Sequence, residues 1–325
     1  MTLLNPPGDT LTLPMPGLEP DNLLALLALL GLLRAIETAR PNWEPRASWR
    51  GKPWVAQLHL AAFPEPMQIA EAAQEGILSL VRRFDVDSPR KKVDFTPDEY
   101  RKYAKRVRSR NDAVAAALAS ALTAECGIGK PKRDGRLEPS PLIIVKGGQL
   151  ETKFFERLIN VPNGALGNPT RKTRARPDFT SPAKIAEALF QPWRHEDDAD
   201  GFRWDPEDDQ RYALRYGDPG LAGAAPTVVG ANRLAAIGFL SFSTVAGTQR
   251  MKIVGTVRSD REWRFIWPIW LTRLSRAGIE ALLAHPDLLD GDRAKLRVMG
   301  VAEIFRARRV KNGNYSSVTR ARPWD

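Results

Sequence analysis

The stretch Asp21-Asn22-Leu23-Leu24-Ala25-Leu26-Leu27-Ala28-Leu29-Leu30-Gly31-Leu32-Leu33 decides the fold of this chain. An aspartate or asparagine can cap the first free amides of a helix, so the leucines that follow are predicted to be helical. These leucines occupy every side of the helical cylinder, and such a helix must be covered all round by other elements. We therefore expect this helix at the centre of the molecule.

The composition of the 325-residue chain, 43% hydrophobic and 8% aromatic, is that of an ordinary folded protein of one elaborate domain or two. The single cysteine, Cys126, excludes an internal disulfide and a cysteine-based zinc site. The apolar run Leu23–Leu33 is shorter than the roughly 20 residues of a membrane-spanning helix, and no basic segment precedes it as in a secretory signal. We predict a cytoplasmic protein with no membrane partner and no cofactor.

The first predicted unit, residues 1–145, combines helices, a sheet and a basic helix. Short alternating runs between Trp43 and Leu60 favour one or two strands, and residues 67–82 have helical spacing. Thr96-Pro97-Asp98-Glu99 is typical of a capped helix start, and we expect one long helix from there to about Glu125. Its first half is cationic and its second half is apolar.

The second predicted unit, residues 146–325, follows a buried strand expected at Leu142–Val145. Its patterns predict a basic loop over residues 160–182, an acidic loop after it and a hairpin turn at Asn312-Gly313. Helices are expected at Glu151–Leu158, Pro182–Phe190, Leu234–Phe239 and Ser275–Ala284, and strands at Met251–Val257 and Trp263–Trp270. The fold class is therefore α+β, an irregular mixture of helix and antiparallel sheet with long basic loops and a C-terminal hairpin.

The formal charge of +11 and the sequence pI near 9.9 call for an abundant anionic partner, of which nucleic acid is the commonest. The cations gather in a few segments, and we predict that these segments bind phosphate groups. The candidate nucleic-acid-binding residues are Lys91, Lys92, Arg101, Lys102, Lys105, Arg106, Arg108, Arg110, Lys130, Lys132, Arg133, Arg171, Lys172, Arg174, Arg176, Arg306, Arg308, Arg309, Lys311, Arg320 and Arg322.

Two of these segments carry a specific argument. In the helix that begins at Thr96, cations one turn apart repel one another without nearby acids, which favours an external anion over a merely solvated face. In the final ribbon, residues 301–322, period-2 alternation puts Arg306 and Arg308 on one face and Arg309 and Lys311 on the other. The alternative is that an edge hairpin carries these charges only to prevent sheet-to-sheet aggregation.

Catalytic patterns are absent from the sequence. His59, His195 and His285 have none of the spacings of metalloenzymes, and no hydrolase or phosphate-loop motif occurs. We expect the carboxylates between Glu196 and Asp209 to form a solvated or counter-ionic loop, with a magnesium-dependent nuclease as the alternative. The tryptophans at 263, 267 and 270 are expected in the core, although they could stack bases. The chain is predicted to be neither an enzyme nor a metal-binding protein.

Several segments together resemble the compact large-subunit family of type I CRISPR surveillance complexes (Cascade), of the I-U or I-G kind. The likeness runs over most of the chain. The segments that carry it are Asp21-Asn22-Leu23, Gly31-Leu32-Leu33-Arg34, Trp43, Ser48-Trp49, Gly147-Gly148-Gln149, Pro192-Trp193-Arg194, Trp204-Asp205-Pro206, Arg211-Tyr212-Ala213-Leu214, Gly230-Ala231-Asn232-Arg233-Leu234-Ala235 and Trp267-Pro268-Ile269-Trp270.

This resemblance implies a non-enzymatic member of an RNA-guided complex. Its partners would be the guide RNA (crRNA) at its 5′ end, target double-stranded DNA near the flanking motif (PAM), other Cascade subunits and a recruited helicase-nuclease. Base pairing would supply the sequence specificity, and the protein would supply charge and shape. The alternative from the charge pattern alone is a stand-alone RNA-binding scaffold protein.

Overall fold

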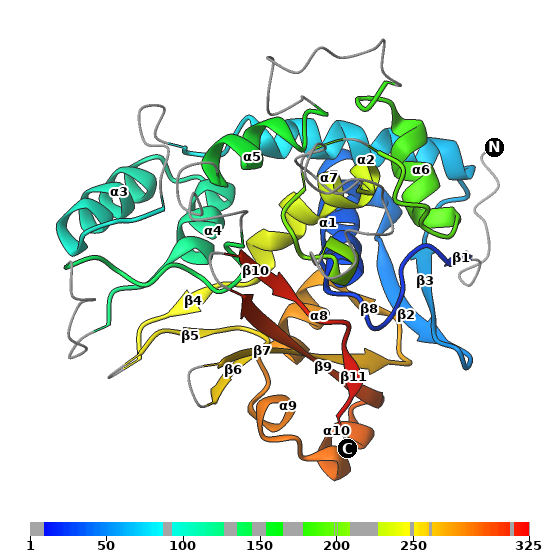
Figure 1. The fold of residues 1–325 in the computed structure, drawn as a ribbon. Helices are drawn as coiled ribbons and strands as arrows, with labels where there is room; N and C mark the ends of the chain where they lie inside the picture. The colour runs from blue at the N-terminus through cyan, green and yellow to red at the C-terminus, as the bar shows by residue number, and fades with distance from the viewer. Residues whose placement is uncertain are drawn as a thin grey trace.

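The computed structural model describes residues 10–86, 93–126, 135–144, 154–164, 178–197, 199, 201–208, 227–247, 250–259, 262–312 and 315–324. Over these residues the protein is α+β, with a group of helices packed against two larger antiparallel sheets, beside a small third sheet of two strands (Figure 1). The predicted fold class is confirmed. One cluster of buried apolar side chains extends from Met15 to Ala321 and includes residues of both predicted units.

The leucine-rich segment forms helix α1 (Leu23–Ala39) at the centre of the molecule, as predicted. Asn22 caps it by accepting a hydrogen bond of 2.9 Å from the amide of Leu24. Every residue from Leu23 to Leu33 is buried, because other helices and sheet cover α1 on all sides. The helices that pack around it include α2 (Pro66–Val81) and α7 (Val229–Gly238), and α6 (Pro182–Phe190) packs on both of those.

Helices α1 and α7 touch through their backbones. A Cβ atom placed on Gly31 would lie 1.8 Å from the carbonyl oxygen of Leu234, and one on Gly238 would lie 1.9 Å from that of Leu27. Such distances are far inside van der Waals contact, so only glycine allows the two helices to approach this closely. The contact joins elements on opposite sides of residue 145, where the sequence predicts a division between two units.

The first sheet has the strand order β1-β3-β2-β8 and is antiparallel throughout. Its strands are β1 (Leu11–Met15), β2 (Arg46–Arg50), β3 (Val55–Leu60) and β8 (Leu274–Ser275). His59 on β3 is buried between two hydroxyl groups: its Nδ1 lies 2.9 Å from Thr12 Oγ1 and its Nε2 lies 2.8 Å from Ser48 Oγ.

The second sheet has the order β10-β9-β7-β6, with β11 also paired to β9. Its strands are β6 (Thr256–Ser259), β7 (Glu262–Trp270), β9 (Val301–Asn312), β10 (Tyr315–Val318) and β11 (Arg322–Pro323). The predicted hairpin is confirmed, since β10 pairs with the end of β9 and Tyr315 lies opposite Asn312. Strand β9 is nevertheless an interior strand, because β7 covers one side of it and β10 and β11 cover the other.

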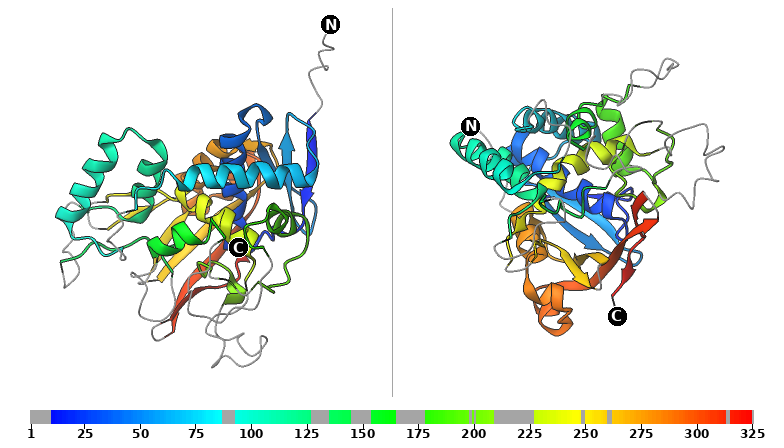
Figure 2. Two further views of the ribbon diagram at one scale, coloured as in Figure 1. Left: turned by 90° about the horizontal axis from the view of Figure 1, so that it is seen from above. Right: turned by 60° about the vertical axis from the view of Figure 1, so that its left-hand side comes forward.

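The remaining described elements surround these layers (Figure 2). Trp267 and Trp270 are almost completely buried on β7, so the core prediction for them is confirmed.

No described helix is both long and apolar enough to cross a lipid bilayer. The remaining described elements are α3 (Pro97–Ser109), α4 (Ala113–Leu122), α5 (Phe154–Asn160), α8 (Arg276–Leu283), α9 (Pro286–Asp290), α10 (Arg293–Val298), the 3-10 turns η1 (Pro41–Trp43), η2 (Pro206–Asp208) and η4 (Phe239–Ser241), and the short strands β4 (Thr244–Val245) and β5 (Lys252–Ile253).

Two predictions about secondary structure were wrong. The long helix expected from Thr96 to Glu125 is divided into α3 and α4, because Asn111 adopts a left-handed conformation with φ of 49°. Asp112 then caps α4 by accepting from the amides of Val114 and Ala115. The residues Leu142–Ile144 are buried as expected but form no strand, because their backbone turns instead of pairing with a neighbour.

We predict that Gly31→Ala destabilises the fold by about 1–3 kcal/mol, because the added methyl group forces α1 and α7 apart. Gly278→Ala on α8 is the matched control, since its Cβ would meet the nearest side-chain atoms at an ordinary 3.6 Å. Urea unfolding monitored by circular dichroism measures both free energies. Equal midpoints for the two variants would contradict the close helix contact.

A second prediction concerns pH. Burial, together with the nearby charge of Arg273, lowers the pKa of His59 to about 4 from its ordinary 6.5. Between these two values the unfolded chain binds a proton that the folded protein excludes, so the free energy of unfolding falls as the pH drops from 6.5 towards 4. His59→Gln should show a smaller loss than the parent protein over this window in the same urea titrations; parallel curves would contradict the assignment.

Candidate nucleic-acid interface

A cleft beside the second sheet gathers five arginines around a volume of about 650 Å³. We call it the arginine cleft. The sheet supplies one wall, the C-terminal segment another, and the turn η2 closes the remaining side with Pro206 and Glu207. The five arginines are Arg264 on β7, Arg306 and Arg308 on β9, and Arg320 and Arg322 near the C-terminus.

The register of the sheet brings these cations together in pairs. Arg264 lies directly opposite Arg308, and Arg322 lies directly opposite Arg306. Alternation along β9 places Arg306 and Arg308 on one face and turns Phe305 and Ala307 into the core. Directly opposite residues have Cβ atoms about 5 Å apart, and like charges in such positions destabilise a sheet.

No carboxylate of a described residue is paired with the four arginines of these two cross-strand pairs. Over the part of the chain that the structure describes, Arg264, Arg306, Arg308 and Arg322 form no ion pair. The Nε atom of Arg264 is buried and has no hydrogen-bond acceptor. Arg306 lies over the indole ring of Trp324, 5.1 Å from its centroid, and this contact holds the guanidinium without reducing its charge.

Arg320 differs from the other four because three carboxylates surround it. Its guanidinium donates to Glu19 at 2.6 Å, to Asp21 at 2.9 Å and to Glu207 at 3.3 Å. Burial opposes the charge of Arg320, but these three acids together raise its pKa above the ordinary value. Arg320 therefore fixes the wall of the cleft, and its charge is already compensated within the protein.

The turn before α1 holds the cleft in place through its backbone as well. The carbonyl of Pro20 accepts from the indole of Trp267 at 2.8 Å, and the carbonyl of Asp21 accepts from the amide of Ala321 at 2.9 Å. The side chain of Asn22 donates to Asp205 at 3.2 Å. One turn thus contacts β7, the C-terminal segment and the chain that leads into η2.

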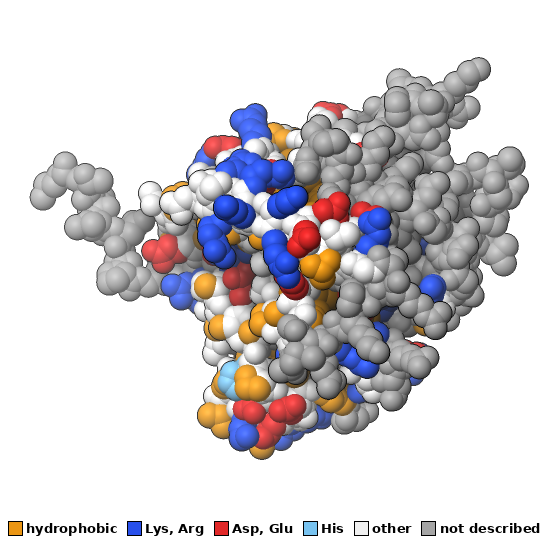
Figure 3. Space-filling model, turned by 90° about the vertical axis from the view of Figure 1, so that its left-hand side faces the viewer, with side chains coloured by type: hydrophobic (Ala, Val, Ile, Leu, Met, Phe, Trp, Pro, Cys, Tyr) orange, Lys and Arg blue, Asp and Glu red, His pale blue; other side chains and the backbone are white. Residues whose placement is uncertain are grey.

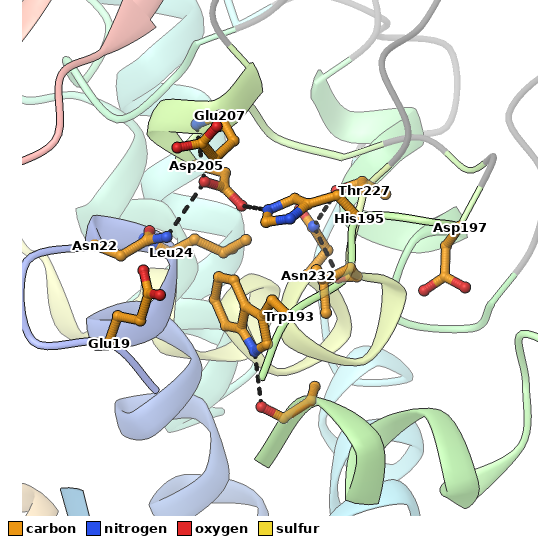
Figure 4. A network of polar contacts seen from close by, with 12 residues as sticks. Glu19, Asn22, Leu24, Trp193, His195, Asp197, Asp205, Glu207, Thr227 and Asn232 are labelled. Carbon is orange, nitrogen blue, oxygen red and sulfur yellow. Dashed lines mark hydrogen bonds and ion pairs between the residues drawn. The ribbon is translucent and has the colours of Figure 1, made fainter. Parts of the chain in front are cut away.

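Asp205 is the centre of a buried polar network behind this wall (Figure 4). It is fully buried and accepts from Asn22, from the amide of Glu207 at 3.0 Å and from Nε2 of His195 at 2.8 Å. The stretch was predicted to be a solvated or counter-ionic loop, and solvation is wrong for Asp205 and for Asp197, whereas the ion pair of Asp197 with Lys184 agrees with the counter-ionic alternative. Asp197 is buried and binds Lys184 at 2.7 Å and the amide of Val229 at 2.9 Å.

Some acidic residues of the stretch fall outside the described residues, namely Asp198, Asp200 and Asp209. Among the residues that are described, no group of three or more His, Cys, Asp or Glu side chains is placed to hold a metal ion. The carboxylate oxygens of Asp205 are both occupied by hydrogen-bond donors, which is the environment of a structural carboxylate.

Helix α3 carries a second group of cations, and Figure 3 shows Lys and Arg side chains gathered on the side of the molecule to which α3 belongs. The expectation that these cations lack nearby acids is wrong for three of them. Arg106 and Arg110 pair with Asp85 at 3.1 and 3.3 Å, and Arg101 pairs with Asp98 at 2.9 Å and with Glu125. Asp85 is nearly buried, so these pairs fasten α3 to the chain that follows α2.

The other three cations of α3 remain exposed. Lys102, Lys105 and Arg108 follow one another at intervals of three residues and therefore lie along one side of the helix. None of them forms an ion pair with a described residue. They make a short cationic stripe, which is what remains of the predicted phosphate track.

The rest of the predicted site residues lie apart from the cleft. Arg309 lies on the opposite face of β9 from Arg308, where burial lowers its pKa to about 10 and Glu138 partly offsets that effect. Lys311 is exposed beyond the cleft. Nine predicted residues fall outside the described part of the chain: Lys91, Lys92, Lys130, Lys132, Arg133, Arg171, Lys172, Arg174 and Arg176.

Arg264 is the one arginine of the cleft that sequence reasoning missed. It stands inside the apolar run Trp263–Trp270, which we interpreted as core strand throughout. The sequence did contain an indication, because Arg264 is a charged residue between Trp263 and Phe265, and a charge in an otherwise apolar strand needs a specific environment. Its partner across the sheet, Arg308, is 44 positions away and is revealed only by the register.

The interior position of β9 argues against the aggregation alternative for Arg306 and Arg308. Charges that block sheet-to-sheet association belong on an exposed edge strand, whereas β9 lies between β7 and β11 at Arg306 and between β7 and the amide of Thr319, which donates to the carbonyl of Arg308, at Arg308. Repulsive cross-strand pairs on an interior strand favour a bound anion instead.

Comparison with known proteins adds no assignment: no family model, no curated protein and no solved structure matches this chain.

The two kinds of arginine should respond differently to neutralisation. We predict that Arg320→Gln lowers the melting temperature, because it leaves three carboxylates without their cation. Arg308→Gln should leave it unchanged or raise it, because it removes repulsion from Arg264. Thermal unfolding at low ionic strength measures both. A larger loss in Arg308→Gln than in Arg320→Gln would show that the charge of Arg308 serves the fold.

Proposed function

We propose that this protein is a non-enzymatic nucleic-acid-binding subunit that holds a phosphate backbone in the arginine cleft. The observation that carries the proposal is the pairing of Arg264 with Arg308 and of Arg306 with Arg322 across the sheet, with no carboxylate of a described residue in an ion pair with any of the four. A protein keeps such a repulsive arrangement when an anion compensates it. Guanidinium groups suit this role because their planar donors match two phosphate oxygens at once.

The cationic stripe on α3 supports a second contact with the same kind of ligand. Lys102, Lys105 and Arg108 present exposed charges on the side of the molecule that projects beyond the core, well separated from the cleft along the chain (Figure 1). Two cationic surfaces allow one molecule of nucleic acid to be gripped at two points. Phosphate contacts of this kind position a protein on nucleic acid without reading its sequence.

The sequence resemblance extends the proposal to a specific assembly. The chain is a large-subunit-like component of a type I CRISPR (Cascade) effector complex in the cytoplasm. Its partners are the 5′ end of the guide RNA, target double-stranded DNA near the flanking motif, the other Cascade subunits and the helicase-nuclease that they recruit. The net charge of +11 and the arginine cleft support this role, because base pairing supplies the sequence and the protein supplies charge.

The stand-alone RNA-binding scaffold uses the same surfaces without partner subunits. Affinity purification of the protein from its native cells separates the two functions. A repeat-derived RNA together with backbone subunits supports the complex. A monomer with heterogeneous RNA contradicts the assembly while leaving nucleic-acid binding intact.

We predict that the double variant Arg264→Gln/Arg308→Gln binds nucleic acid at least tenfold more weakly than the parent protein. Each lost phosphate contact should also reduce the slope of log affinity against log salt by about 0.7 to 0.9. Fluorescence anisotropy with a labelled oligonucleotide over a series of salt concentrations gives both quantities.

The matched control for this experiment is Arg50→Gln, which neutralises an exposed arginine on β2 in the other sheet. It should change neither the affinity nor the slope by more than the error of the measurement. If the control and the double variant lowered the affinity equally, the binding would depend only on the overall charge of the protein. That result would overturn the role of the cleft.

A further inference from the structure

We propose that the arginine cleft binds a compact polyphosphate, in which two or more phosphate charges lie within the length of one nucleotide. The inference rests on the same cleft as the proposed function, and it specifies the ligand chemistry that the cleft selects. Two sources share this chemistry: a free nucleoside triphosphate, and a strand end that carries a terminal phosphate.

The density of positive charge is the first argument. Four guanidinium groups come from two adjacent cross-strand pairs, so their Cβ atoms are about 5 Å apart across the sheet and roughly 7 Å apart along β9. An internal phosphodiester carries a single negative charge, whereas a phosphate monoester carries about −1.5 to −2 at pH 7. Four cations without an ion pair to a described carboxylate therefore match the densest phosphate charge that a nucleotide or a strand end offers better than evenly spaced internal phosphates.

The size of the cleft is the second argument. Its volume of about 650 Å³ lies within the range of roughly 300–1,000 Å³ that is typical of sites for small molecules and cofactors. A ligand of nucleotide size can therefore enter between the sheet and η2.

The orphaned donor on Arg264 is the third argument. Its Nε atom is buried and lacks an acceptor, although the residue lines the cleft beside Arg308. Four other buried nitrogens of the described residues also lack an acceptor, on Arg34, Trp49, Arg157 and Arg258, and Arg264 is the one of these five residues that lines the cleft. A phosphate that reaches the β7 side of the cleft can supply an oxygen as the acceptor.

The two ends of the cleft define where the polyphosphate lies. Glu207 lines the η2 side, where Arg320 engages it, so the negative ligand is expected on the opposite side, against β7 and β9. There the guanidinium of Arg306 lies over the indole ring of Trp324. Arg264, Arg306 and Arg308 are the residues that contact the phosphates, and Arg322 adds a fourth charge from β11.

The test is isothermal titration calorimetry of the full-length protein with inorganic tripolyphosphate, at constant ionic strength. We expect measurable binding to the parent protein, affinity lowered at least tenfold in Arg264→Gln and in Arg308→Gln, and no change in Arg50→Gln. Arg308→Lys should fall between the parent and Arg308→Gln, because it keeps the charge and loses the planar fork. Circular dichroism establishes that each variant is folded, and Arg322→Gln, on an exposed side chain, replaces Arg264→Gln if that variant fails to fold.

Two further titrations distinguish the sources of the phosphate. The cleft is assigned to a free nucleotide if ATP binds as tightly as tripolyphosphate and a 5′ phosphate does not change the affinity of an oligonucleotide. Tighter binding of a 5′-phosphorylated oligonucleotide than of its 5′-hydroxyl counterpart assigns it to a strand end. Either result supports the proposal.

The failure of this inference differs from the failure of the proposed function. No binding of tripolyphosphate, or equal binding by the cleft variants and the parent, overturns the inference even if those variants lose affinity for nucleic acid. Binding of tripolyphosphate by the cleft, together with no binding of any oligonucleotide, overturns the proposed function and leaves the inference intact.

Discussion

The turn from Glu19 to Asn22 is the constraint on which the architecture of the site depends. Its backbone carbonyls bind Trp267 and the amide of Ala321, its acids bind Arg320, and Asn22 both caps α1 and donates to the buried Asp205. Because α1 is enclosed on all sides, this turn cannot shift without moving the core. The positions of the cleft walls therefore follow from the burial of one apolar helix.

The arginine cleft differs from other parts of the fold in how its charged side chains are paired. In several other places acids and bases are matched, as where Asp85 pairs with Arg106 and Arg110 and where Glu280 pairs with Arg34 and Arg276. In the cleft, cations face cations across an interior strand. Departures from local rules are expected at functional sites, where the surrounding structure is stable enough to tolerate them. The ordered core behind β7 and β9 makes such a departure possible.

Much of the site was predictable from residue patterns. Alternation along β9 correctly separated Arg306 and Arg308 from Arg309, and the turn at Asn312-Gly313 predicted the pairing that follows. Arg264 could not be predicted, because its relation to Arg308 is a matter of register between distant segments. The same limit applies to α3, where Asp85 and Glu125 approach the helix only after the chain folds back.

By itself, the sequence determined the central leucine helix, the bounds of α6, the antiparallel hairpin and the excess of cationic charge, because each of these arises from neighbouring residues or from composition. Only the tertiary structure decided which charges are compensated. Arg101, Arg106, Arg110 and Arg320 pair with carboxylates, whereas the four cleft arginines other than Arg320 have no ion pair with a described residue. The reason is physical: electrostatic interaction depends on distance in space, and separation along the chain does not specify that distance.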